Sequence, residues 1–278
     1  MAFDEKTWLI TGCSSGFGRE LALEALARGH RVVVTARRPE SSADILAHYP
    51  DRALGLRLDV TSADDIREAV ARAEALGGID VLVNNAGYAL MGGVEEVAPD
   101  EYRPLFETNF FGSVAMMQAV LPGMRARRRG HIVNISSMGG ISGGLGMGFY
   151  GATKFAMAAI SESLAQEAAP LGIRVTVIEP GSHRTQAISG ITQAAVEIAD
   201  YAETVGRHRQ KLVSVAGSER GDARLAAKAI ADITEAEDPP LHLPLGSDAL
   251  ERLDRKIDLM SRESALWRDT ILSTAVPA

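Results

Sequence analysis

Short apolar runs alternate with segments of helical pattern throughout residues 7–181. The runs are rich in β-branched residues, and the segments between them have the spacing of amphipathic helices. Parallel strands joined by right-handed helical crossovers produce this alternation. The sequence therefore predicts an α/β fold, with a doubly wound parallel sheet, helices on both faces, and a single domain over residues 1–278. The expected strands are "TWLI", "HRVVVTA", "LGLRLDV", "IDVLVNNAG", "GHIVNISS" and "IRVTVIEPG", and the expected helices cover residues 18–29, 44–48, 64–76, 101–124 and the segment after Tyr150.

Two later segments depart from the alternation. Residues 182–217 contain helical patches such as "ITQAAVEIADYAETVGRH" but no strand-like run, and we expect them to form a lid over the carboxyl end of the sheet. Residues 247–271 predict a C-terminal helix with Ser247 as its cap. Its apolar residues fall on one face, which is typical of packing against a core, and they are Leu250, Leu253, Ile257 and Met260.

Composition excludes several classes of protein. A net charge of −7 and a pI near 5.5 argue against a nucleic-acid partner. Cys13 is the single cysteine, so no internal disulfide can form and a reducing compartment is favoured. The N-terminus lacks the layout of a signal peptide, and no apolar run approaches the ~18 residues of a membrane helix. We therefore expect a cytoplasmic protein without a membrane span.

A glycine-rich loop joins the first expected strand to the first expected helix. In "LITGCSSGFGRE" the glycines are Gly12, Gly16 and Gly18. Such a loop brings backbone N–H groups and a helix N-terminus close to a pyrophosphate, because no Cβ blocks the approach. The spacing differs from the common G-x-G-x-x-G fingerprint. An ordinary strand-to-helix turn remains the alternative.

The end of the second expected strand indicates which dinucleotide binds. An acid at this position would bind the ribose hydroxyls of NAD, but the sequence has Arg37 and Arg38 and no acid before Glu40. A guanidinium matches the geometry of a 2′-phosphate. The sequence therefore predicts NADP(H) as the cofactor, and the alternative is that both arginines merely solvate a loop.

Taken together, the motifs resemble those of the short-chain dehydrogenase/reductase family, in its single-domain type. The matching landmarks are "TGxxxGxG" at Thr11, Gly12, Gly16 and Gly18, Asp59 in "LDV", "NNAG" at Asn84 to Gly87, Asn109, Ser137, "YxxxK" at Tyr150 and Lys154, and "PGxxxT" at Pro180, Gly181 and Thr185. The resemblance implies cofactor contacts from Gly12, Ser14, Ser15, Gly16, Phe17, Gly18, Arg37, Arg38, Asp59, Val60, Asn85, Ala86, Gly87, Tyr150, Lys154, Pro180, Gly181 and Thr185. Some phosphate-binding relatives carry a basic residue where this chain has Ser15, which leaves an NAD(H)-preferring enzyme open.

Tyr150 and Lys154 are four residues apart and share one face of a helix. A cation near a phenol favours the phenolate and lowers its pKa from the usual ~10. The resemblance implies that Tyr150 is the general acid in reduction and the general base in oxidation. It also implies that Lys154 holds the nicotinamide ribose, that Ser137 positions the substrate oxygen, and that Asn109 holds a water of a proton relay. An exposed helix face is the alternative for the pair.

The expected substrate site is apolar. Its walls are predicted to include Tyr88, Met91, Leu145, Met147 and Phe149, closed over by residues 182–205, which favours a neutral, hydrophobic carbonyl or secondary alcohol. In the alternative, Leu145 and Met147 pack into the core, the pocket is polar, and Arg184 anchors a carboxylate. His183 is either a substrate contact or a surface histidine.

The preferred function is an NADP(H)-dependent oxidoreductase that interconverts a carbonyl and a secondary alcohol. The alternatives are a dinucleotide-binding regulator without turnover and a sugar-nucleotide epimerase or dehydratase, and the loop spacing argues against the last. The "VIEPG" segment resembles that of retinol and hydroxysteroid dehydrogenases. No histidine has metal-ligand spacing, so no metal site is predicted. Surplus apolar residues in 105–124 and 155–169 predict a homodimer or homotetramer.

Overall fold

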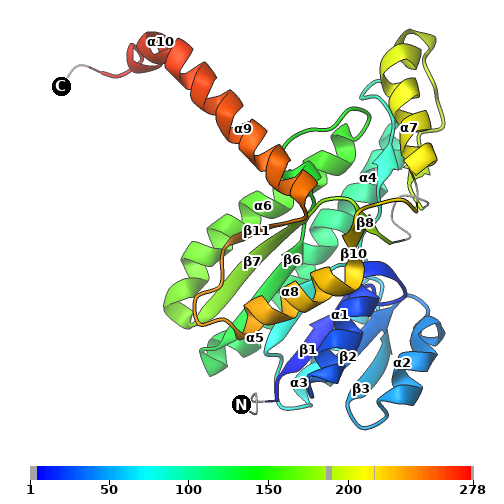
Figure 1. Ribbon diagram of the computed structural model, residues 1–278. Helices are drawn as coiled ribbons and strands as arrows, with labels where there is room; N and C mark the ends of the chain where they lie inside the picture. The colour runs from blue at the N-terminus through cyan, green and yellow to red at the C-terminus, as the bar shows by residue number, and fades with distance from the viewer. Residues whose placement is uncertain (1–4, 186–189, 216, 277–278) are drawn as a thin grey trace.

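Seven parallel strands form the central sheet of the computed structural model, which describes residues 5–185, 190–215 and 217–276. The strand order β3-β2-β1-β4-β6-β7-β11 shows that the chain builds outward from β1 on one side and from β4 on the other. The predicted doubly wound α/β fold is confirmed (Figure 1). The strands are β1 (Thr7–Ile10), β2 (Arg31–Ala36), β3 (Ala53–Arg57), β4 (Val81–Asn84), β6 (Gly130–Ile135), β7 (Ile173–Pro180) and β11 (His242–Leu245).

Helices cover both faces of this sheet. One face packs against α1 (Gly16–Ala27), α2 (Ala43–His48) and α8 (Ala223–Glu235). The other face packs against α3 (Ala63–Glu74), α5 (Gly112–Arg127) and α6 (Gly148–Ala168). Shorter helical segments connect these elements, namely η1 (Pro39–Ser42), η3 (Met138–Gly140) and η4 (Ala169–Leu171).

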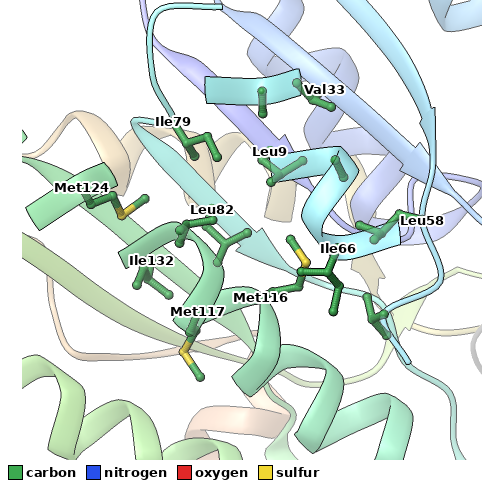
Figure 2. Packing of buried hydrophobic residues seen from close by; sticks show 14 of the residues in the cluster. Leu9, Val33, Leu58, Ile66, Ile79, Leu82, Met116, Met117, Met124 and Ile132 are labelled. Atoms are coloured by element: carbon green, nitrogen blue, oxygen red, sulfur yellow. The ribbon is translucent and has the colours of Figure 1, made fainter. Parts of the chain in front are cut away.

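Because side chains of a strand point alternately to its two faces, each strand supplies both layers of the core. In β1, Leu9 joins the cluster under α3 and α5, whereas Trp8 and Ile10 join the cluster under α1 and α8. Figure 2 shows the first cluster, in which Leu82 and Met116 lie among leucine, isoleucine and methionine side chains. All four residues of β1 are buried, as expected for a strand covered on both faces.

The helix predicted over residues 101–124 is a longer, composite one. It consists of α4 (Pro99–Phe106), the π-helical turn η2 (Glu107–Phe111) and α5. A π turn holds one more residue than an α turn, so it changes the direction of the side chains that follow it. Asn109 lies within this turn and is buried.

The predicted lid region contains strands as well as helices, so the expectation of a strand-free segment was wrong. β8 (His183–Arg184) pairs with β10 (Gly221–Asp222), and β9 (Thr192–Gln193) pairs with β5 (Leu90–Met91). The helical part follows as η5 (Ala199–Tyr201), η6 (Ala202–Gly206) and α7 (Arg207–Val215). Strands of two residues satisfy backbone groups of the neighbouring loops, and such short pairings leave no periodicity in the sequence. Residues 186–189 and 216 of the predicted lid lie outside the described residues.

The C-terminal helix does not face the core as predicted. Figure 1 shows α9 (Ser247–Leu266) projecting away from the sheet and ending in α10 (Arg268–Leu272). Its residues Ile257 and Met260 are 53% and 55% exposed. The predicted cap is also wrong, because the N-cap is Gly246 and no side chain caps it. Periodicity identified the apolar face of the helix but could not identify what covers it.

Candidate functional site

The glycine loop is held by side-chain hydrogen bonds from the segment after β4. The Asn85 amide nitrogen donates to the carbonyl oxygens of Thr11 at 2.9 Å and Gly12 at 3.0 Å. In return, the Thr11 hydroxyl accepts from the backbone N–H groups of Asn85 and Ala86, both at 2.9 Å. A Cβ on Gly18 would lie 2.4 Å from the Asn85 amide nitrogen, so only glycine fits there. The "NNAG" motif therefore shapes the loop that the first glycine motif begins.

A cavity of about 470 Å³ opens beside this loop. The N-terminus of α1 lies at it, and Ser15, the N-cap, makes no side-chain capping bond. Backbone N–H groups at a helix N-terminus favour an anion, so the residues fit a dinucleotide pyrophosphate. The lining residues are Ser14, Ser15, Gly16, Arg19, Glu20, Arg184, Thr185 and Ala223.

Arg184 thus lies at the glycine loop together with Ser14 and Ser15. This position favours a role for Arg184 beside the glycine loop, and its alternative role as the anchor of a substrate carboxylate stays a prediction. Thr185 also lines the cavity, and a Cβ on Gly16 would lie 3.6 Å from it. The residues after β7 therefore close the loop from the opposite side.

Arg37 follows β2 and is exposed, as is Arg38. Neither guanidinium lies within salt-bridge distance of a carboxylate in the described part of the chain. The pKa of Asp59 lies below its usual value, mainly because the hydroxyl and N–H of Thr61 donate to it and also because of the charge of Arg37. Arg37 and Asp59 are thus close enough for the charge of the arginine to act on the carboxylate. The Val60 side chain is buried against Gly112 of α5, so a cofactor contact from Val60 stays a prediction.

The four residues of the predicted catalytic set converge at the carboxyl ends of β4 and β6. The Lys154 ammonium donates to the Ile135 carbonyl at 2.8 Å and lies 5.8 Å from the centre of the Tyr150 ring. The Ser137 hydroxyl lies beside the Tyr150 ring, since a Cβ on Gly139 would be 3.5 Å from both, and it accepts from the N–H of Gly139 at 3.0 Å. The side chains of Ser137, Tyr150 and Lys154 therefore lie close together.

Gly87 joins this group to the fourth residue, Asn109. A Cβ on Gly87 would lie 2.9 Å from Asn109 Oδ1 and 3.8 Å from Lys154 Nζ. The Asn109 side chain donates to the Tyr88 carbonyl at 2.8 Å and accepts from the Tyr88 N–H at 3.0 Å. The Asn109 side chain is thus hydrogen-bonded to the backbone of Tyr88. The water that the sequence assigns to Asn109 stays a prediction.

Burial controls the ionisation of the central pair. Burial raises the pKa of the Tyr150 phenol, and the hydrogen bond with Ser137 opposes this only in part. Burial also lowers the pKa of the Lys154 ammonium from 10.5 to about 8. The net shift of the Tyr150 pKa in the protein chain by itself is therefore upward, and not downward as expected from the nearby ammonium alone. Both side chains are buried away from water, and this loss of solvation disfavours the phenolate form of Tyr150 and the ammonium form of Lys154.

An apolar cavity of about 400 Å³ lies beside Gly148, two residues before Tyr150. Leu145 lines it and is 51% exposed at its edge. Lid residues form part of its wall as well. The full lining is Gly92, Gly93, Val94, Gly144, Leu145, Gly146, Gly148, Tyr201, Thr204 and Val205.

The other predicted wall residues do not line this cavity. Met91 is fully buried, and Phe149 stacks on Tyr102 with ring centroids 4.6 Å apart. Tyr88 packs in the same small cluster as Phe149, and Met147 is half-buried. Aromatic and methionine residues near an active site serve the core as readily as a pocket, and the sequence does not distinguish the two.

His183 is buried, so the surface-histidine alternative is excluded. Its ring lies edge-on to Phe17 of the glycine loop, 5.1 Å away, and its Nδ1 lies 3.1 Å from the Gly181 carbonyl oxygen. A Cβ on Gly221 would lie 2.4 Å from the ring. These contacts are with the glycine loop and with β10, and a contact between His183 and the substrate stays a prediction.

Glu96 fastens the lid to the segment after β5, a role that the sequence analysis missed. Its carboxylate accepts from the N–H of Gly93 at 2.7 Å and of Ile198 at 2.9 Å, and Arg209 lies 3.5 Å away. Burial alone would raise the pKa of Glu96, but these donors outweigh it and keep the pKa below its usual range. Glu101 adds a second bond, from the N–H of Ala195 at 2.9 Å. Both acids stand in the "EE" and "DE" pairs of residues 95–101, which look like ordinary solvated charges.

Comparison with known proteins identifies the family. The sequence profile of the short chain dehydrogenases matches residues 6–195. The chain belongs to this family. The fold is similar to a short-chain dehydrogenase of known structure from Streptomyces avermitilis, with 43% identity, a TM-score of 0.91 and coverage of 98% of this chain and 100% of the other. The family resemblance inferred from the motifs is therefore confirmed.

Two further similarities concern the chemistry of this short-chain dehydrogenase. Human retinol dehydrogenase 8 is 38% identical over 73% of this chain and 67% of its own length. The structure of ElxO with NADP bound is 28% identical, with a TM-score of 0.75, and covers 89% of this chain and 99% of the other. Membership of the family makes the chain an oxidoreductase with a nicotinamide dinucleotide as cofactor.

The described residues of this dehydrogenase contain neither a metal-binding cluster nor a membrane-spanning helix. No group of three or more histidine, cysteine, aspartate or glutamate side chains is arranged to hold a metal ion within residues 5–185, 190–215 and 217–276. No helix in the same residues is both long and apolar enough to cross a bilayer.

The Glu96 contacts predict how the lid is held. Glu96→Ala should remove two backbone hydrogen bonds to a charged group, worth about 1.5–3 kcal/mol each. The amides of Gly93 and Ile198 should then exchange with solvent roughly 10-fold faster or more, measured by hydrogen–deuterium exchange. Glu95→Ala is the matched control, because the exposed Glu95 accepts a hydrogen bond from the Tyr201 hydroxyl and bonds no backbone N–H in the described residues. Equal protection in the two variants would refute the fastening role.

Proposed function

We propose that the protein is an NADP(H)-dependent dehydrogenase/reductase that interconverts a carbonyl and a secondary alcohol on a neutral, hydrophobic small molecule. The convergence of Ser137, Tyr150, Lys154 and Asn109 around Gly87 carries this proposal. Phenol, hydroxyl and ammonium together serve a reaction in which one proton accompanies a hydride. A regulator without turnover would not need a buried cation beside a phenol, since the burial of a cation costs free energy.

The chain's own residues supply the proton. A nicotinamide cofactor, when bound, supplies or accepts the hydride. In reduction, Tyr150 donates its proton to the carbonyl oxygen, and in oxidation it accepts the proton of the alcohol. Ser137 hydrogen-bonds the same oxygen and holds it near the phenol. The Lys154 charge stabilises the phenolate that reduction leaves behind, and the electrostatic effect is large because the site is poorly solvated.

The cofactor would lie across the carboxyl ends of β1, β2 and β4. Gly12, Gly16 and Gly18 allow its pyrophosphate to approach the N-terminus of α1, and Arg184 adds a positive charge there. Asp59, Asn85, Pro180, Gly181 and Thr185 are the further contacts that the family motifs assign. Arg37 and Arg38 have no carboxylate partner in the described part of the chain and so suit a 2′-phosphate. ElxO, which binds NADP, supports the choice of NADP(H).

The substrate would place its apolar part in the cavity between Leu145 and the lid. Glycine, leucine and valine form most of this wall, and Arg184 lies at the glycine loop instead. Retinol dehydrogenase 8, a relative named for a largely apolar alcohol, supports this substrate class. We further propose one domain over residues 1–278 and association through the outer faces of η2, α5 and α6, where Phe111 of η2 and Phe155 of α6 are exposed.

Tyr150→Phe tests the mechanism. The change removes the proton donor and keeps the ring, so kcat should fall roughly 10²–10⁴-fold while cofactor binding is kept. Steady-state NADPH oxidation with a panel of ketones and a fluorescence titration of the cofactor measure the two effects. Tyr49→Phe, a tyrosine outside the site, is the control and should retain full activity. Near-wild-type turnover by Tyr150→Phe would refute the proposed reaction, and no turnover by the wild type would favour the regulator.

Arg37→Asp tests the cofactor. The wild type should have a higher kcat/KM for NADPH than for NADH, because a guanidinium pairs with the 2′-phosphate. The variant should lose or reverse this preference, since its carboxylate repels the phosphate and can accept ribose hydroxyls. Arg72→Asp, on the exposed end of α3, is the control for charge alone. A wild type that prefers NADH would overturn this part of the proposal.

A pair of matched ketones tests the pocket. Along a homologous series of neutral ketones KM should fall, because each buried CH₂ contributes about 0.8 kcal/mol. A carboxylated analogue of the same length should have a lower kcat/KM, because its charge loses water without gaining a partner. Steady-state kinetics with the neutral and the carboxylated ketones distinguishes an apolar pocket from a polar one. A clear preference for the carboxylated ketone would refute the apolar site.

A further inference from the structure

The apolar face of α9 has no partner within the described chain. The helix leaves the body near Gly246, and from Ile257 onward its side chains are exposed. Exposed apolar side chains on this scale are costly in water and mark interaction surfaces. The exposed large apolar residues of this arm are Leu250, Ile257, Leu259, Met260, Leu266, Trp267, Ile271 and Leu272.

Four of these eight residues follow the spacing of a coiled-coil seam. Steps of three and four residues lead from Leu250 to Trp267. Two helices pair through such a stripe, because successive heptads return to the same side of the helix. The seam positions are Leu250, Leu253, Ile257, Met260, Ser264 and Trp267. At a rise of 1.5 Å per residue, the stripe from Leu250 to Trp267 is about 25 Å long.

The arm cannot turn this stripe onto its own body, because its foot is fixed. The Asp248 carboxylate accepts from the N–H of Ser182 at 2.7 Å and from the N–H of Ala249 at 3.1 Å. Arg252 lies beside Gly144, where a Cβ would be 3.6 Å from the guanidinium. The helix continues unbroken from this foot to Leu266. A second molecule must therefore supply the partner surface.

We propose that the α9 arms of two copies of this chain pair antiparallel. In this arrangement the seam is complementary to itself. Leu250 lies opposite Trp267 of the second copy, Leu253 opposite Ser264, and Ile257 opposite Met260. Five of the six seam residues of each copy are apolar, so the pairing buries apolar side chains of both copies against each other. A two-fold axis near residues 258–259 relates the two copies.

Charge complementarity selects the second copy as the occupant. Residues that flank the seam on one side are Lys256 and Glu263. In the antiparallel pair Lys256 of each copy faces Glu263 of the other. Two equivalent lysine–glutamate ion pairs therefore form. The pairing also brings Trp267 and α10 of the second copy to the foot of α9. Arg252 and Gly144 lie there, and Gly144 is part of the wall of the apolar cavity.

A double-cysteine variant tests the direction of the pairing. Leu250→Cys and Trp267→Cys in one chain lie about 25 Å apart along their own helix, too far for a disulfide within the chain. Antiparallel pairing brings each beside the other in the second copy, so mild oxidation should give a disulfide-linked dimer on a non-reducing gel. Cys13 is buried and its pKa is raised to about 12, so it does not compete. The Trp267→Cys single variant should remain unlinked.

Light scattering on the purified full-length protein measures the strength of the pairing. Ile257→Glu with Met260→Glu adds two negative charges to the seam and should halve the particle mass at micromolar concentration. Arg262→Glu, on the opposite face of α9, changes the charge equally and should leave the mass unchanged. Circular dichroism and cofactor binding confirm that each variant is folded. Halving is expected whether or not the copies also associate through α5 and α6.

Charge exchange provides the last comparison. Lys256→Glu alone should weaken the assembly, because it sets two glutamates against each other. Lys256→Glu with Glu263→Lys should restore the mass of the wild type. A monomeric wild type, an unchanged mass in the seam variant, or absence of the cross-linked dimer would each overturn the proposal. These readouts do not depend on turnover, so they are independent of the proposed reaction.

Discussion

The bonds between Asn85 and the glycine loop are the constraint on which the site depends. β1 and β4 are neighbours at the point where the chain reverses its direction of winding, and their carboxyl ends part there. The amide of Asn85 donates to the carbonyls of Thr11 and Gly12, so the two loops that leave these strands are joined. This joint fixes the N-terminus of α1 on one side and Gly87 on the other. The glycine loop and the proposed catalytic residues are therefore neighbours in the fold.

Burial controls the ionisation of Lys154 and Tyr150. The Lys154 ammonium is withdrawn from water, and a backbone carbonyl of β6 holds it. Its pKa of about 8 and the raised pKa of Tyr150 both follow from desolvation. In the protein chain by itself the phenol is therefore in its protonated form near neutral pH, ready to donate. A charge bound nearby has a large effect in such a site, because little water screens it.

Polar contacts with backbone position the parts outside the sheet. Glu96 holds the lid through the N–H groups of Gly93 and Ile198, and Asp248 holds the foot of α9 through the N–H of Ser182. A carboxylate that accepts backbone N–H groups fixes a segment without a large apolar contact. The lid and the arm therefore take defined positions although they contribute little to the two core clusters. The apolar surfaces of both remain available for a substrate or a second molecule.

The sequence by itself determined the order of the elements, the doubly wound sheet and the set of side chains that we propose as catalytic. Periodicity and β-branched runs specify strands and helices locally, and the spacing of Ser137, Tyr150 and Lys154 places them on adjoining elements. Only the tertiary structure decided which apolar residues line a cavity, that Arg184 lies at the glycine loop, and that α9 leaves the body. It also assigned Glu96, which reads as a solvated charge in sequence, to the lid. These outcomes depend on contacts between segments distant in the chain, and a pattern within one segment identifies its apolar face but not its neighbour.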